Sequence, residues 1–142
     1  MTTLLDHAAT CRDRAYAPYS LFKVGAAIRA TSGRIYQGVN VENAAYPEGT
    51  CAEAGAIAAM ILGGDSAIEE VAVIADATVP VAPCGGCRQK IAEFAAPGVR
   101  ITMANLKGDS ATMTLADLLP GAFEPCHMPD APAPSPAQSP AP

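Results

Sequence analysis

Apolar residues recur every three or four positions in two stretches of the chain, and this spacing predicts helices. Leu4 and Ala8 set the spacing in the first stretch, and Ile57 and Ile61 set it in the second. Proline and glycine flank these stretches, as they do at helix ends. We expect helices over residues 3–15, ended by Pro18; 51–62, ended by Gly63 and Gly64; 83–95, closed by Pro97 and Gly98; and a short helical turn over 116–119.

Shorter apolar, β-branched runs lie between the predicted helices and predict strands over residues 22–30, 34–41, 70–75, 99–106 and 111–114. Ser32 and Gly33 separate the first two runs, as in the turn of an antiparallel hairpin. The other strands alternate with helices. This order predicts an α/β fold, a three-layer α/β/α sandwich around a mixed sheet of about five strands.

The C-terminal segment differs in composition from the rest of the chain. From Pro125 onward, proline, alanine, serine and glutamine predominate, which leaves too little apolar surface to order the segment. We therefore expect one domain over residues 1–127 and a disordered tail over 128–142. Aromatic residues make up 5% of the 142 residues and tryptophan is absent, so aliphatic side chains must fill the core.

The overall charge narrows the partners that the protein can bind. The formal net charge of −5 argues against nucleic acid or an anionic membrane as the main partner. No apolar run reaches the roughly 18 to 20 residues of a membrane helix, and the first residues do not resemble a signal peptide. We expect a cytoplasmic protein. In a reducing compartment, its five cysteines point to metal binding or catalysis rather than disulfides.

Two segments carry candidate chemistry, and each starts a predicted helix. One is CAE at residues 51–53, and the other is PCGGC at 83–87. The free N–H groups at a helix start favour thiolates, and thiolates bind zinc. Cys51, Cys84 and Cys87 could thus supply three ligands to one Zn²⁺ per chain. Three protein ligands leave a position for water, as in catalytic zinc sites.

Glu53 follows a candidate zinc ligand by two positions, so it lies near the metal without binding it. A carboxylate there can take a proton from water and pass it to a substrate. Two other interpretations remain open. A structural zinc would need a fourth ligand from Cys11, Cys126, His7 or His127, whereas a thiol redox protein would cycle Cys84 and Cys87 through a disulfide.

The chain resembles the cytidine deaminases, specifically the small homotetrameric kind. The resemblance covers roughly residues 5–123 and rests on several blocks in the same order. They are APYS at 17–20, FKVGAA at 22–27, NVENAAY at 40–46, PCGGCRQ at 83–89 and LLPGAF at 118–123. It implies zinc-dependent hydrolysis of cytidine and 2′-deoxycytidine to the uridines and ammonia, a reaction of pyrimidine salvage.

The resemblance also implies a role for each matching position. Cys51, Cys84 and Cys87 would bind zinc, and Glu53 would move the proton. The substrate-binding residues would be Phe22 against the pyrimidine, Asn40 and Glu42 on a ribose hydroxyl, the backbone of Ala52 on the base, and Tyr46 and Phe123 at a neighbouring subunit's site. The expected partners are a nucleoside and further copies of the chain, with neither nucleic acid nor membrane.

One position departs from the family pattern. Many relatives have an arginine directly after Cys-Ala-Glu, where this chain has Ala54. Three thiolates leave a zinc centre with a formal charge of −1, and Arg88 is the nearby residue expected to offset part of it. Two further functions remain open: deamination of another aminopyrimidine nucleoside such as blasticidin S, and a non-catalytic zinc-binding scaffold.

Overall fold

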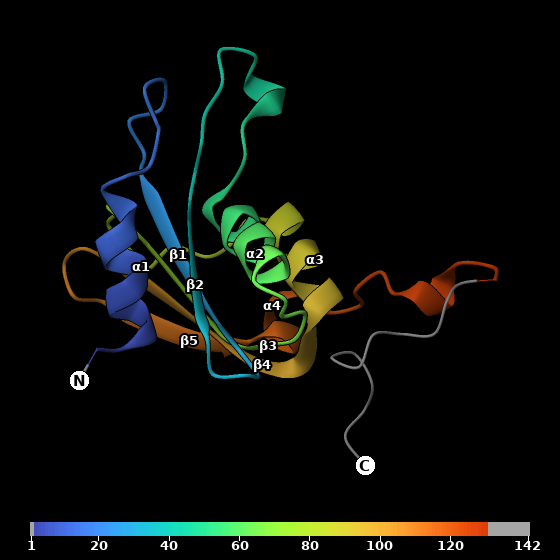
Figure 1. Ribbon diagram of the computed structural model, residues 1–142. Helices are drawn as coiled ribbons and strands as arrows, with labels where there is room; N and C mark the ends of the chain where they lie inside the picture. The colour runs from blue at the N-terminus through green and yellow to red at the C-terminus, as the bar shows by residue number, and fades with distance from the viewer. Residues whose placement is uncertain (1, 131–142) are drawn as a thin grey trace.

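A single mixed sheet with helices on both faces forms the body of the molecule in the computed structural model, which describes residues 2–130 (Figure 1). The strands are β1 (Val24–Ala30), β2 (Ile35–Val39), β3 (Ile68–Ala75), β4 (Ala95–Asn105) and β5 (Ser110–Thr114). The helices are α1 (Leu4–Arg12), α2 (Ala52–Leu62), α3 (Gly85–Phe94) and α4 (Leu115–Leu118), with short 3₁₀ turns η1 (Tyr46–Glu48) and η2 (Pro125–His127).

The strands lie in the order β2-β1-β3-β4-β5. β3 and β4 run parallel and are connected through α3, whereas every other neighbouring pair is antiparallel. The β1–β2 hairpin turns at Gly33, whose φ of 90° is readily adopted only by glycine. The predicted mixed five-stranded α/β fold is confirmed.

The two faces of the sheet are covered by different helices. On one face, Leu4 and Ala8 of α1 pack against small residues such as Ala27 and Ala72. On the other face, α2 and α3 bury Met60 and Ile91 in a larger cluster that includes Ile101. Figure 1 shows α1 on one side and α2 and α3 together on the other, which gives three layers.

Two predicted boundaries were wrong by three residues or more. The strand predicted to start at residue 99 begins at Ala95, directly after α3 ends at Phe94, so Pro97 and Gly98 lie within β4 and do not close a helix. A register shift between Ile68 and Glu70 of β3 absorbs the extra residues of β4. The first helix ends at Arg12 rather than at residue 15, because the chain turns there to bring Tyr16 beside Val41. 

The predicted disordered tail lies outside the described residues from position 131 onward. Across residues 2–130, none of the helices combines the length and apolarity that crossing a membrane requires.

Glycine allows β2 to approach α2 closely. A Cβ atom at Gly38 would overlap the carbonyl oxygen of Ala52 and the amide nitrogen of Ala56. Both of these atoms belong to the backbone of α2, so they cannot move aside as a flexible side chain would. Gly38 thereby determines how near the start of α2 lies to the sheet.

We expect Gly38→Ala to lower the free energy of unfolding by about 2 to 3 kcal/mol, because overpacking against backbone forces α2 away from β2. Gly98→Ala is the matched control, since nothing lies within 4 Å of a Cβ built there. Urea unfolding followed by circular dichroism measures both variants. Equal stability of the two variants would contradict this account of the contact.

Candidate metal centre and substrate cavity

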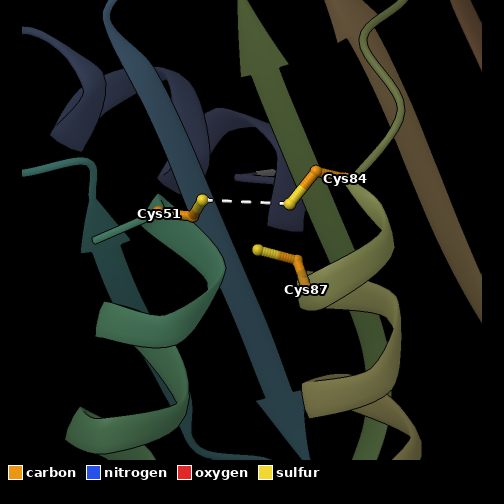
Figure 2. Close-up of side chains that lie close together, drawn as sticks. All are labelled: Cys51, Cys84 and Cys87. Carbon is orange, nitrogen blue, oxygen red and sulfur yellow. Dashed lines mark hydrogen bonds between the residues drawn. The ribbon is translucent and has the colours of Figure 1, made fainter. Parts of the chain in front are cut away.

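Two helix starts meet on the same face of the sheet and bring three cysteines together (Figure 2). Cys51 is the N-cap of α2, and Cys84 is the N-cap of α3. Cys87 lies in the first turn of α3 and is fully buried. Figure 2 shows the three side chains pointing toward one another between the two helices.

The spacing of the sulfurs fits a tetrahedral zinc ion. Two sulfurs bound at about 2.3 Å to such an ion lie about 3.8 Å apart. The Cys51 and Cys84 sulfurs are 3.9 Å apart, and all three sulfurs lie within 4.8 Å of one another. Among the described residues, these cysteines form the one group of three or more His, Cys, Asp or Glu side chains with this spacing.

The negative charges of Glu53 and of neighbouring thiolates would be stabilised by a bound cation. Burial raises the pKa of the Cys87 thiol, and the adjacent Glu53 carboxylate raises it further. Burial also raises the pKa of Cys51, whereas a hydrogen bond from the backbone N–H of Cys87 lowers the pKa of Cys84. A divalent cation would offset the mutual repulsion of the thiolates. The donor set therefore fits one zinc ion per chain.

Glu53 lies in the first turn of α2, beside this group. Its side chain is buried, with a relative exposure of 4%, and its Oε2 accepts a hydrogen bond from Cys87 Sγ at 3.3 Å. Glu53 also lines a cavity of about 380 Å³, together with Cys51 and Cys84. A carboxylate in this position can exchange a proton with a molecule bound in the cavity.

The cavity collects most of the residues predicted to bind substrate. Its size lies within the usual range of small-molecule sites. Apolar side chains and polar groups both contribute to its wall, so it can hold a flat ring and a sugar. The predicted residues that line it are Phe22, Asn40, Glu42, Tyr46 and Ala52.

Asn40 and Glu42 extend from the end of β2 and also hold the segment that precedes β1. Asn40 Oδ1 accepts from Val24 N at 2.8 Å, and its Nδ2 donates to Phe22 O at 2.8 Å. Glu42 Oε1 accepts from the backbone N–H groups of Tyr19 and Ser20, and Oε2 accepts from the Ser20 hydroxyl. The two side chains thus form one wall of the cavity and fix its shape.

Four residues with a role predicted from the sequence do not contact the three sulfurs or the cavity. Phe123 does not line this cavity: it borders a separate pocket beyond α4, with its ring centroid 5.5 Å from that of His127. Arg88 hydrogen-bonds to the carbonyl oxygens of Pro83 and Leu118 rather than to sulfur. Cys11 donates to backbone carbonyls near α1, and Cys126 contacts Glu124.

Sequence reasoning assigned no role to several residues that line the cavity. They are Ser20, Val24, Val41, Gly49, Thr50, Val81 and Ala82. Ser20 belongs to the APYS block, and that block is the sequence signal that could have pointed to it. Val81 and Ala82 lie in the loop between β3 and α3, where the sequence shows no distinguishing pattern.

The family model described as the cytidine and deoxycytidylate deaminase zinc-binding region matches residues 1–103. A cytidine deaminase of Sporosarcina psychrophila is 47% identical over 120 residues, which cover 84% of this chain and 88% of the relative. A second cytidine deaminase, from Halalkalibacterium halodurans, is 42% identical and covers 84% of this chain and 91% of the relative.

A crystal structure of cytidine deaminase from Burkholderia pseudomallei superposes with a TM-score of 0.83 at 40% identity, covering 87% of this chain and all of that one. The chain therefore belongs to the zinc-dependent cytidine deaminase family. Family membership confirms the resemblance that the sequence blocks indicate.

We expect Cys84→Ala to lose about tenfold or more of the bound zinc, because two remaining thiolates hold the ion far less well than three. Cys126→Ala, which also removes an exposed thiol, keeps one zinc per chain. Elemental analysis after dialysis against a weak chelator measures the zinc content of both variants. Loss of zinc from Cys126→Ala would instead indicate a four-ligand structural site.

Proposed function

We propose that this protein hydrolyses cytidine and 2′-deoxycytidine to uridine and 2′-deoxyuridine, with release of ammonia. The observation that carries the proposal is the placement of Glu53 beside three converging cysteines on the wall of a cavity of nucleoside size. The chain belongs to the zinc-dependent cytidine deaminase family, and the relatives named above are cytidine deaminases.

The proposed chemistry centres on proton movement by Glu53. Cys51, Cys84 and Cys87 would hold a zinc ion, which would supply the Lewis acidity that lowers the pKa of water. Glu53 accepts a proton from the attacking water as the water oxygen bonds to C4 of the pyrimidine. Glu53 then delivers that proton to N3. Glu53 then takes the proton of the hydroxyl group now on C4 and gives it to the amino group as the C4–N bond breaks, so ammonia leaves and C4 becomes a carbonyl.

The remaining cavity residues orient the nucleoside. Phe22 packs against the pyrimidine ring, and the backbone at Ala52 contacts the base. Asn40 and Glu42 bind a ribose hydroxyl, for which a donor and an acceptor side by side are suitable partners. We assign the activity to a catalytic domain over residues 1–127.

The two alternative classes leave parts of the site without a role. A thiol redox protein has no use for Glu53 beside its cysteines. A zinc scaffold needs a fourth protein ligand, and the group found within residues 2–130 contains three cysteines. Another aminopyrimidine nucleoside such as blasticidin S would use the same chemistry, and a comparison of kcat/KM across substrates separates it from cytidine.

We further propose that the active form is a homotetramer in which Tyr46 and Phe123 border a neighbouring subunit's site. Tyr46 is 75% exposed and Phe123 is 58% exposed, an unusual degree of exposure for aromatic side chains. The loop that carries η1, and with it Tyr46, projects well beyond the sheet (Figure 1). A neighbouring subunit would cover both rings.

The proposed setting is pyrimidine salvage in the cytoplasm. Zinc binding requires Cys51, Cys84 and Cys87 to stay reduced, and a reducing compartment keeps them so. The formal charge of −5 favours a free nucleoside over a polynucleotide as substrate.

We expect Glu53→Gln to lower kcat for cytidine by about 10³-fold, because the amide cannot accept and deliver the proton. Zinc content stays at one per chain, since the sulfurs are unchanged. The loss of cytidine absorbance and the release of ammonia measure the rate. Glu69→Gln, at an exposed position, is the control and keeps normal turnover. Near-normal turnover by Glu53→Gln would refute the mechanism.

We expect Phe123→Ala to lower kcat/KM about tenfold, about 1.4 kcal/mol, although Phe123 does not line its own subunit's cavity. When Phe123→Ala and Glu53→Gln chains are coexpressed and purified as mixed oligomers, activity recovers. Each restored site then combines Glu53 of one subunit with Phe123 of another. Mixed oligomers no more active than Phe123→Ala alone, or an active monomer in light scattering, would contradict the shared site.

A further inference from the structure

Ser20 connects the two parts of the cavity wall that face the nucleoside. Its hydroxyl donates to Glu42 Oε2 and accepts a hydrogen bond from Phe22 N at 3.0 Å. Glu42 is the proposed ribose ligand, and Phe22 is the proposed partner of the pyrimidine. One hydroxyl group therefore lies between the sugar-binding carboxylate and the base-binding ring.

The hydrogen bonds around Glu42 define what remains for a ligand. Its Oε1 accepts from Tyr19 N at 2.9 Å and from Ser20 N at 3.1 Å, while Oε2 accepts from the Ser20 hydroxyl. A carboxylate has about four acceptor positions, so one remains, on Oε2. The Ser20 hydroxyl and the two backbone donors lower the pKa of Glu42, which keeps it ionised and able only to accept.

Asn40 supplies the complementary donor. Its Oδ1 faces a backbone N–H and its Nδ2 faces a backbone carbonyl, which fixes the orientation of the amide. One N–H of the amide is engaged with Phe22 O, and an amide nitrogen has two. The wall therefore offers one donor and one acceptor to a hydroxyl group, which can accept from Asn40 and donate to Glu42.

The backbone between Ser20 and Phe22 adopts an unusual conformation that makes this link possible. Leu21 has a φ of 59°, in the left-handed backbone region that residues other than glycine rarely adopt. Its N–H donates to Ala17 O at 3.0 Å, which closes a tight turn. The turn places the Ser20 hydroxyl and the Phe22 N–H within hydrogen-bond distance, and both residues line the cavity.

We propose that Ser20 is a positioning residue for nucleoside recognition: its hydroxyl holds the Glu42 carboxylate in the orientation that accepts a ribose hydroxyl. The proposal rests on the proposed function. Removing the Ser20 hydroxyl frees Oε2, so the carboxylate can rotate about Oε1, which stays held by the N–H groups of Tyr19 and Ser20. The orientation of Oε2 must then be restored each time a nucleoside binds. The penalty falls on substrates that carry the ribose hydroxyls and spares those that lack them.

The β1–β2 hairpin provides a matched control. Ser32 Oγ donates to Asp65 Oδ2 at 2.9 Å and accepts from Arg34 N at 3.3 Å. This is the same arrangement of serine, carboxylate and backbone N–H two residues onward. Val24, at the start of β1, lines the cavity, whereas Ser32 follows the other end of β1.

The test compares cytidine with 2′,3′-dideoxycytidine for the wild type, Ser20→Ala, Ser20→Thr and Ser32→Ala. We expect Ser20→Ala to lower kcat/KM for cytidine about tenfold, mainly through KM, with kcat nearly unchanged. For 2′,3′-dideoxycytidine the same substitution changes kcat/KM by less than about threefold. Ser20→Thr keeps a hydroxyl and stays near the wild type, and Ser32→Ala matches the wild type on both substrates.

Two results would overturn the proposal. An equal loss on both substrates would show that Ser20 only stabilises the loop, and an unchanged kcat/KM for cytidine would show that Glu42 does not depend on it. A wild-type protein that fails to deaminate cytidine would refute the proposed function instead. The wild-type arm therefore distinguishes the two failures.

Discussion

The site depends on two helix starts that converge on one face of the sheet. Cys51 and Cys84 are the N-caps of these two helices, and their sulfurs lie side by side, where both can bind a metal. The close contact of Gly38 with α2 places one helix start, and the β3–α3–β4 connection places the other. With the two helix starts placed in this way, the sulfurs of Cys51 and Cys84 are 3.9 Å apart.

Much of this arrangement could be predicted from the sequence because its signals are local. Helix starts follow from Pro83 and from the apolar spacing after Cys51, and the hairpin follows from Ser32 and Gly33. The strand order and the faces covered by the helices need contacts between distant segments, for which the sequence carries no direct signal. The start of β4 at Ala95 was missed because Pro97 and Gly98 look like a helix stop. In the structure both residues lie within β4, where the register shift between β3 and β4 accommodates them.

The same distinction applies within the site. The three cysteines and Glu53 could be predicted as one group, because their spacing at helix starts indicates metal chemistry, and the structure places them side by side. The partners of Asn40 and Glu42 could not be predicted, since their hydrogen bonds reach back to residues 19–24. Arg88 shows the limit of proximity in sequence: it follows Cys87 directly, yet its guanidinium points toward α4.

The position of the sulfurs relative to the core has a consequence for how the protein matures. Both apolar clusters are assembled from the sheet and helices without Cys51 or Cys84, which are exposed. Small zinc domains that lack such a core fold only when the metal binds. Here the apolar clusters contain none of the three cysteines, although Cys87 is itself buried beside them, so the core does not need the metal to hold it together. A chain that folds on its apolar core can bind zinc after folding, which distinguishes it from domains that fold only around the metal.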